Sequence, residues 1–252
     1  AAVKLVAESN RIQELAGAPF VYYIEELPPE EIPLNNESGV SHGTTILQNS
    51  LPGIGRNLSG KGVVIGMGDN GGAGHHIDHY YKTIESWPSG VYHSSHVAGI
   101  MAGAGLIDPR MKGRAPEASL VVELFSDIFL KTPQYYSQFG MLLTNNSYGS
   151  SASACRTFGG YNSNSQYIDQ QLLDYPAIMH VFATGNEVTR ICPPFPAGFQ
   201  TVFGGAQSAK NTITVGGSNK DPLTNFYSKG PTLDGRIKPE ITAIGRNVFS
   251  TV

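Results

Sequence analysis

Five short apolar runs, each ending in glycine or polar residues, constrain the fold of this chain most strongly. They span residues 60–68, 119–125, 141–149, 178–186 and 211–217, and apolar runs of this length are typical of strands buried on both faces of a sheet. Helical patterns lie between them at 93–104 and 163–174, and the second has Ser163 and Gln166 at capping-box spacing. Strands that alternate with helices predict an α/β fold with a mostly parallel central sheet and helices on both faces.

The charge balance excludes several classes of partner. Only 15% of the 252 residues are charged and the formal net charge is -3, which gives no electrostatic reason to expect nucleic acid or an anionic membrane surface as a partner. We expect no membrane span, because no apolar run approaches the roughly 18–20 residues of a membrane-spanning helix. The N-terminus also lacks the basic start and apolar middle of a signal peptide.

The N-terminal region differs in composition from the rest. Residues 1–16 carry apolar positions at helical spacing, residues 19–26 have the pattern of a short strand, and "LPPEEIP" is a stiff acidic connector. After residue 34 the sequence becomes glycine-rich. We therefore expect an N-terminal extension over 1–40 and a separate main domain over 41–252.

Three polar residues follow predicted strands. Asp69, Ser147 and Asn186 each stand at the end of an apolar run, and ligands gather at the carboxyl edge of parallel sheets. Each of them, taken alone, is equally typical of an ordinary turn.

Five of the seven histidines lie between residues 75 and 96, and two interpretations stay open. The pair His93 and His96 lacks the glutamate of the HExxH zinc motif, although "HHIDH" offers a further metal ligand. The alternative is that His93 is a general base at the start of a helix, oriented by Asp69, while His96 only packs.

The ordered motifs resemble those of the subtilase family of serine endopeptidases. "GKGVVIGMGDNG" is similar to the strand with the catalytic aspartate, "HSSHVAGIMAG" to H-G-T-H-V-A-G, and "NNSYG" to N-x-S-x-G. "GRAPEASL" resembles the family segment that follows the histidine motif, and "VFATGN", "NTITVGG" and "FYSKGP" resemble later family segments. The likeness covers about residues 57–252 and is greatest to secreted subtilases of Bacteroidetes-type bacteria.

The resemblance implies a subtilisin-like, three-layer α/β fold and peptide-bond hydrolysis by an Asp-His-Ser triad. It makes Asp69 and His93 catalytic and Asn186 an oxyanion donor, and it implies a peptide or protein substrate. Substrate-binding positions follow from the motifs as Ser147, Tyr148, Gly149 and Gly185. A structural calcium stays open, because Asp78 matches a calcium ligand of some relatives while the loop 104–114 departs from their calcium loop. We assign no metal site.

The nucleophile motif G-T-S-M-A-x-P is absent from these residues. The sequence ends in "KPEITAIGRNVFSTV", which resembles the strand before that motif. We expect a catalytic domain that is incomplete at its C-terminus, with the serine on a downstream segment or a second chain. The fragment alone should then be inactive, and residues 1–34 resemble the tail of a prosegment. A catalytically inactive subtilase-fold binding subunit is the alternative, and a metal-binding α/β protein is a third.

Two cysteines fit either one disulfide in an oxidising compartment or two buried thiols in the cytosol. Cys155 and Cys192 stand in loop-like sequence after neighbouring predicted strands. We therefore predict a disulfide between them and a secreted or cell-surface bacterial protein whose signal peptide has been removed.

Overall fold

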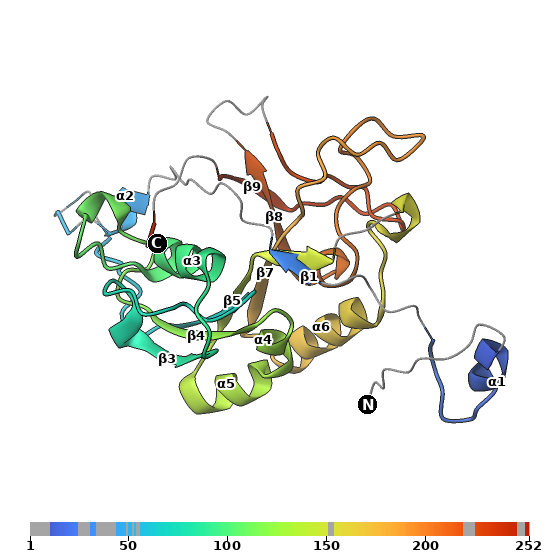
Figure 1. Cartoon of the computed structure of the whole chain (residues 1–252), viewed down its shortest axis with the longest axis horizontal. Coiled ribbons are helices and arrows are strands. Elements are labelled where there is room, and N and C mark those ends of the chain that lie inside the picture. Colours follow the sequence, from blue (N-terminus) through green and yellow to red (C-terminus); the bar gives the residue numbers. More distant parts are fainter. Residues whose placement is uncertain are drawn as a thin grey trace.

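A seven-stranded parallel sheet organises the chain (Figure 1). The computed structural model describes residues 11–24, 31–33, 44–48, 50, 51, 53, 56–150, 154–218, 225–245, 250 and 251. The strand order is β3-β4-β2-β5-β7-β8-β9, and every neighbouring pair is parallel. The strands are β2 (Val64–Asp69), β3 (Thr83–Ser86), β4 (Ser119–Leu124), β5 (Leu143–Asn146), β7 (Met179–Ala183), β8 (Ile213–Ser218) and β9 (Ile241–Ile244). The predicted α/β class is confirmed.

Helices lie on both sides of this sheet. The helix α3 (Tyr92–Ala102) covers one face, and α4 (Asp127–Leu130), α5 (Thr132–Phe139) and α6 (Ser163–Asp174) cover the other (Figure 1). The remaining helices are short: α1 (Ile12–Ala16), α2 (Thr44–Gln48), η2 (Tyr80–Lys82), η3 (Pro109–Met111), η4 (Cys155–Thr157) and η5 (Gly205–Ser208). None of the described helices is long and apolar enough to span a membrane.

The core is built from alternate residues of β2 and β4. Met67 and Leu120 pack with Val97 and other residues of α3 in one buried cluster, whereas Val121 packs with Ile128 on the opposite face. Because successive strand residues point to opposite faces, this alternation places the two helix layers on either side of the sheet.

The predicted strand 141–149 is divided in two. After β5 the chain turns at Ser147, and β6 (Tyr148–Ser150) leaves the sheet to pair antiparallel with β1 (Glu31–Pro33). The strand expected at 19–26 is wrong, since its described part has no regular structure. The helical pattern over 1–16 appears at α1, and residues 1–10 lie outside the described residues.

The start of α6 shows a second small shift. The capping box forms one residue earlier than its predicted position: the Asn162 side chain accepts from the backbone of Ser165, and the Ser165 hydroxyl accepts from the backbone of Asn162. A neighbouring serine and asparagine can both cap a helix, so spacing alone did not choose between them.

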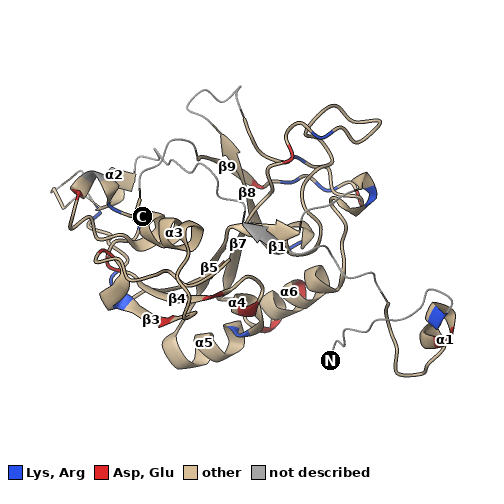
Figure 2. Cartoon of the chain, in the orientation of Figure 1, with Lys and Arg blue, Asp and Glu red and all other residues tan. Residues whose placement is uncertain are grey.

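Charged side chains of both signs are dispersed over the described surface (Figure 2). Neither sign covers a whole face in this view, in keeping with the small formal net charge of -3.

Candidate active site

The side chains of Asp69 and His93 meet at the carboxyl end of β2. Asp69 ends that strand, and His93 lies in the first turn of α3. The Asp69 Oδ1 atom is 2.6 Å from His93 Nδ1 and also accepts the backbone N–H of Asn70 at 2.8 Å. Asp69 is fully buried, and His93 is 9% exposed. The carboxylate therefore holds Nδ1 as a donor, which leaves Nε2 as the nitrogen that can accept a proton.

The turn 70–72 and the start of α3 fix this pair. The Ser94 hydroxyl is 2.5 Å from the carbonyl oxygen of Gly72, and Gly72 bridges to Gly90. A Cβ on Gly72 would overlap the carbonyl of Trp87, so only glycine permits this close approach. The Ser94 hydroxyl thus anchors the helix to the aspartate turn.

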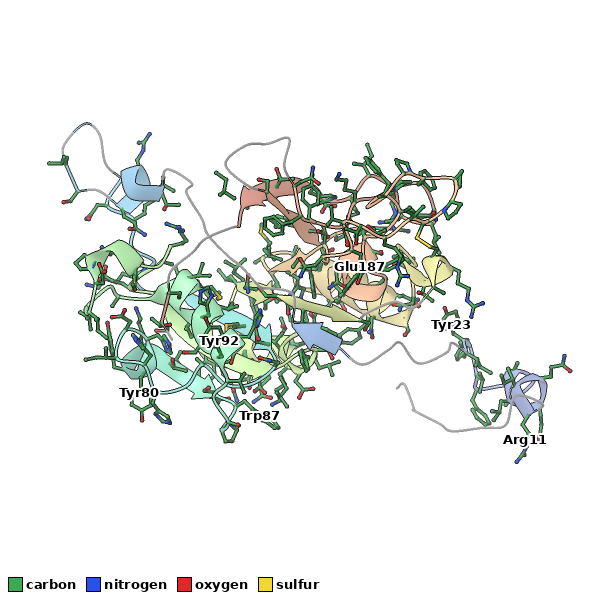
Figure 3. All side chains as sticks on the ribbon, turned by 45° about the horizontal axis from the view of Figure 1, so that its top comes forward. Arg11, Tyr23, Tyr80, Trp87, Tyr92 and Glu187 are labelled. Carbon is green, nitrogen blue, oxygen red and sulfur yellow. A yellow bond between two sulfur atoms is a disulfide. The ribbon has the colours of Figure 1, made fainter. Side chains whose placement is uncertain are left out.

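Ser147, Gly185 and Asn186 line a groove of about 220 Å³. The positive φ of 116° at Gly185 favours glycine, and Asn186 after it is exposed. Val97 of α3, one turn beyond His93, lines the same groove. Figure 3 shows Tyr92, which precedes His93, and Glu187, which follows Asn186, on either side of β1 in that view.

The groove has an apolar floor and wall. It is bounded by α3 and by one face of the strands β5, β7, β8 and β9, through Val97, Ile100, Met101, Asn145, Val181, Ala183, Val215 and Ile244. The structure thus brings Asp69 to His93 at the start of α3, and brings Ser147 and Asn186 together in the groove beside the rest of that helix.

One edge of β6 is paired with another strand, β1. Pro33 is opposite Tyr148, Ile32 is opposite Gly149 and Glu31 is opposite Ser150. The segment that the sequence predicts to bind substrate can therefore accept an extended backbone in antiparallel orientation, which is how many sites bind peptides.

Comparison with known proteins decides the family. Residues 60–252 match the model of the subtilase family. The chain belongs to the subtilase family. It is thus a member of a family of serine proteases.

Two solved structures are similar to this subtilase. A crystal structure of MycP1 with its N-terminal propeptide removed shares 18% sequence identity and a TM-score of 0.50, over 77% of this chain and 67% of that chain. A cold-adapted subtilisin-like serine proteinase shares 17% identity and a TM-score of 0.49, over 82% of this chain and 72% of that chain. The similarity to MycP1 supports the assignment of the fold.

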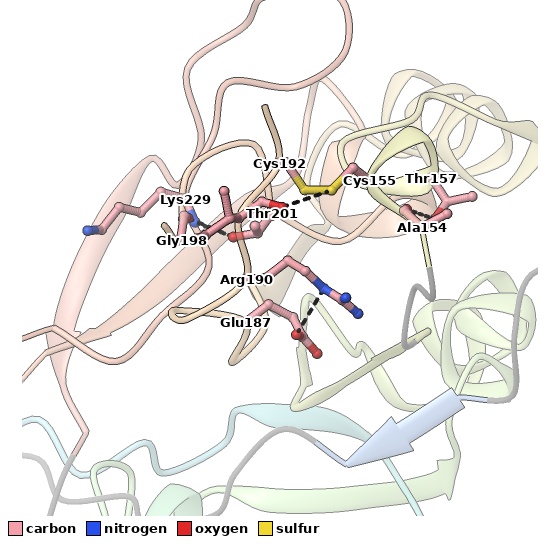
Figure 4. The surroundings of a disulfide bond; sticks show 10 residues. Ala154, Cys155, Thr157, Glu187, Arg190, Cys192, Gly198, Thr201 and Lys229 are labelled. Carbon is pink, nitrogen blue, oxygen red and sulfur yellow. Dashed lines mark hydrogen bonds and ion pairs between the residues drawn. A yellow bond between two sulfur atoms is a disulfide. The ribbon is translucent and has the colours of Figure 1, made fainter. Parts of the chain in front are cut away.

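The predicted disulfide of the subtilase is present (Figure 4). Cys155 and Cys192 are joined, with their Cα atoms 5.4 Å apart. The bridge ties the loop after β6 to the loop that follows Asn186, and Cys192 is fully buried. Figure 4 shows the ion pair of Glu187 and Arg190 near this bridge.

The structure does not gather the side chains of the described residues 75–79 into a group that could hold a metal ion. His79 is fully buried, and burial, aided by the nearby His76, lowers its pKa to about 4. The Asp78 Oδ1 atom accepts the backbone N–H of Leu106 at 2.7 Å and so holds the loop 104–114 directly. Among the described residues, no three His, Cys, Asp or Glu side chains are placed to hold a metal ion. These residues do not fit a calcium bound through carboxylates, and we derive no step through one.

Two further features beside the site were not predicted from the sequence. These are the pairing of β1 with β6 and the position of Phe203, whose ring packs against Gly149 and Gly185. The glycines at 149 and 185 are the only signal in the sequence for the second feature, because glycine often marks the close approach of another group.

Proposed function

We propose that this subtilase is a serine endopeptidase in which Asp69, His93 and Asn186 serve the reaction. His93 takes the proton of a serine hydroxyl as it attacks the peptide carbonyl, and returns it to the leaving amine. Asp69 holds the imidazole in the correct tautomer and stabilises the imidazolium. The observation that carries this proposal is the 2.6 Å contact of a fully buried carboxylate with His93 at the end of a parallel strand.

The strand β6 and the segment at Gly185 and Asn186 supply substrate binding and charge stabilisation. The backbone of Ser147, Tyr148 and Gly149 binds the substrate as an added antiparallel strand. Asn186, which is exposed after Gly185, donates to the oxyanion of the tetrahedral intermediate. Such donors act on charge that develops only in the transition state.

In this proposal the nucleophile is a serine that is not among the 252 residues of this sequence. The serine hydroxyls around α3 already bond to backbone carbonyls: Ser94 to Gly72, Ser95 to Thr251, and Ser250 to His96. The apolar groove between α3 and the sheet face is a suitable seat for the segment that bears the serine. An exposed apolar surface of this kind favours an apolar partner.

The N-terminal segment, we further propose, is a prosegment tail that lies in the substrate position. This is supported by β1, which pairs with β6 in the orientation proposed for substrate. Mass spectrometry of the natural protein should therefore find an N-terminus near residue 34, and an N-terminus at Ala1 would favour a permanent extension.

The disulfide also supports export, because such bonds persist in oxidising compartments. We accordingly propose a secreted or cell-surface location. Finding the protein in the cytosolic fraction with two free thiols would contradict it.

A fluorophosphonate probe on the protein translated from the complete gene tests the proposed activity. We expect covalent labelling that His93→Ala abolishes, because the probe reacts only with a serine activated by its base. His75→Ala, which changes an exposed histidine, is the matched control and should be labelled like the wild type. A folded protein that is not labelled would instead indicate an inactive binding subunit.

A further inference from the structure

Phe203 lies between two segments that flank the proposed substrate path. Its ring is 1% exposed. A Cβ on Gly149 would overlap the Cδ2 atom of the ring, and a Cβ on Gly185 would lie 2.8 Å from both Cδ1 and Cε1. One edge of the ring therefore touches the backbone of β6, and the other edge touches the segment before Asn186. The ring sets the distance between them.

Further contacts of the Phe203 backbone and ring hold the ring in place. The backbone N–H of Phe203 donates to the Thr184 carbonyl at 3.1 Å, and its ring stacks on Phe158 with centroids 5.9 Å apart. Both rings belong to one buried cluster with Cys192, against which Cys155 also packs. Because the disulfide joins the two loops around this cluster, the ring cannot move away without disturbing a cross-linked core.

A peptide in the proposed orientation has to place one side chain in this region. The residue whose carbonyl is attacked pairs with β6 through its backbone and directs its carbonyl oxygen to Asn186. Its side chain then points between Gly149 and Gly185, where the ring already fills the deeper space. This step rests on the proposed function.

We propose that Phe203 is a specificity-determining residue, which limits the residue on the acyl side of the cleaved bond to glycine, alanine or serine. A larger side chain would require the ring to move, and close-packed interiors resist such displacement. The substrate class is thus peptides with a small residue immediately before the cleaved bond.

The test compares two fluorogenic peptides that differ only in that residue, alanine or phenylalanine, with the protein from the complete gene. The wild type should favour the alanine peptide by about 10-fold or more in kcat/KM, since size differences of a few methylenes in a pocket give such ratios. Phe203→Ala should raise kcat/KM for the phenylalanine peptide and reduce or reverse the ratio. Phe203→Leu should have an intermediate effect and is the milder variant should the alanine variant fold poorly.

Met141→Ala and Met141→Leu are the matched controls, because Met141 is equally buried but belongs to a cluster with Val121, Ile128 and Tyr135, which includes no residue of the proposed substrate path. They should lower stability and leave the ratio of the two kcat/KM values unchanged. A wild type that favours phenylalanine, or equal changes of the ratio in the Phe203 and Met141 variants, would overturn the proposal. If fluorophosphonate labelling and hydrolysis of both peptides are absent, the proposed function itself fails.

Discussion

The two halves of the sheet differ in how they are covered. In β2 and β4 most residues are buried, and Met67, Leu120, Val121 and Val122 have no exposed surface. In β7 the residues alternate: His180 and Phe182 are buried, Met179 is 46% exposed, and Val181 is partly exposed. A strand with helices on both faces shows the first pattern, and a strand covered on one face shows the second.

The difference follows from the position of α3. This helix packs on β2 and β4, while α6 and η5 pack on the opposite face of β7 and β8. In the part of the chain that the structure describes, no helix covers the α3-side face of β7 and β8. The proposed base and its aspartate thus belong to the closed half, and Asn186 belongs to the open half. The closed half is packed on both faces, whereas one face of the open half has partly exposed strand residues.

The largest effect should come from the closed half. Asp69→Asn in the protein from the complete gene should lower kcat about 10⁴-fold, because an amide at this position favours the wrong tautomer of His93. Steady-state hydrolysis of a peptide checks the rate, and circular dichroism checks that the fold is kept. A loss below about 10-fold would remove Asp69 from the proposed role.

A matched pair of substitutions measures the difference in packing. In the 252-residue chain, Val122→Ala should lower the free energy of unfolding by about 2–3 kcal/mol, from two buried methyl groups and the cavity that they leave. Val181→Ala, on the partly exposed face, should cost less than about 1 kcal/mol. Urea unfolding of both variants checks this, and equal costs would mean that the two halves are equally packed.

The stability of the protein should depend on pH through His180, a buried residue of β7. Burial lowers the pKa of His180 to about 4, and its neutral ring is held between Thr144 at 2.7 Å and Gln171 at 2.8 Å. Between about pH 6.5 and pH 4 the unfolded chain binds one proton more than the folded chain. The stabilisation by the neutral His180 ring is therefore complete above pH 6.5 and is lost as the pH falls. The free energy of unfolding should fall by about 3 kcal/mol in total.

The variant His180→Asn isolates this contribution, because it keeps a donor and an acceptor but cannot titrate. Unfolding free energies of both proteins, measured from pH 7 to pH 4, should differ in slope by up to about 1.4 kcal/mol per pH unit. Parallel slopes would contradict the assignment to His180.

The elements that the sequence predicted well are local. The strand β2, the helix α3 and the pair of Asp69 and His93 follow from short motifs, in which the end of a strand and the start of a helix fix the position of each side chain. The pairing of Pro33 with Tyr148 was not predictable, because it joins distant segments through the backbone. The contacts of Phe203 were not predictable either, because a phenylalanine in a loop belongs to no periodic pattern that would indicate its neighbours.

Contacts between buried polar side chains were also not predictable from the sequence. The Tyr135 hydroxyl lies 3.0 Å from Glu85 and also bonds to Glu123. Burial, together with the hydrogen bonds to these two carboxylates, raises the pKa of Tyr135 well above its usual range. Glu85 and Glu123 stand on neighbouring strands, and Tyr135 stands on α5. Their meeting depends on the register of β3 with β4 and on the packing of α5, which no single segment determines.

Thiol labelling of two engineered cysteines tests most directly whether the open half is the seat of a further segment. Val122→Cys and Val181→Cys are each compared in the 252-residue chain and in the protein from the complete gene, with Cys155 and Cys192 kept in their disulfide. We predict that Val122→Cys is protected in both proteins, and that Val181→Cys reacts in the shorter chain and is protected in the complete protein. Equal reactivity of Val181→Cys in the two proteins, with Val122→Cys protected in both, would contradict a segment seated on this face.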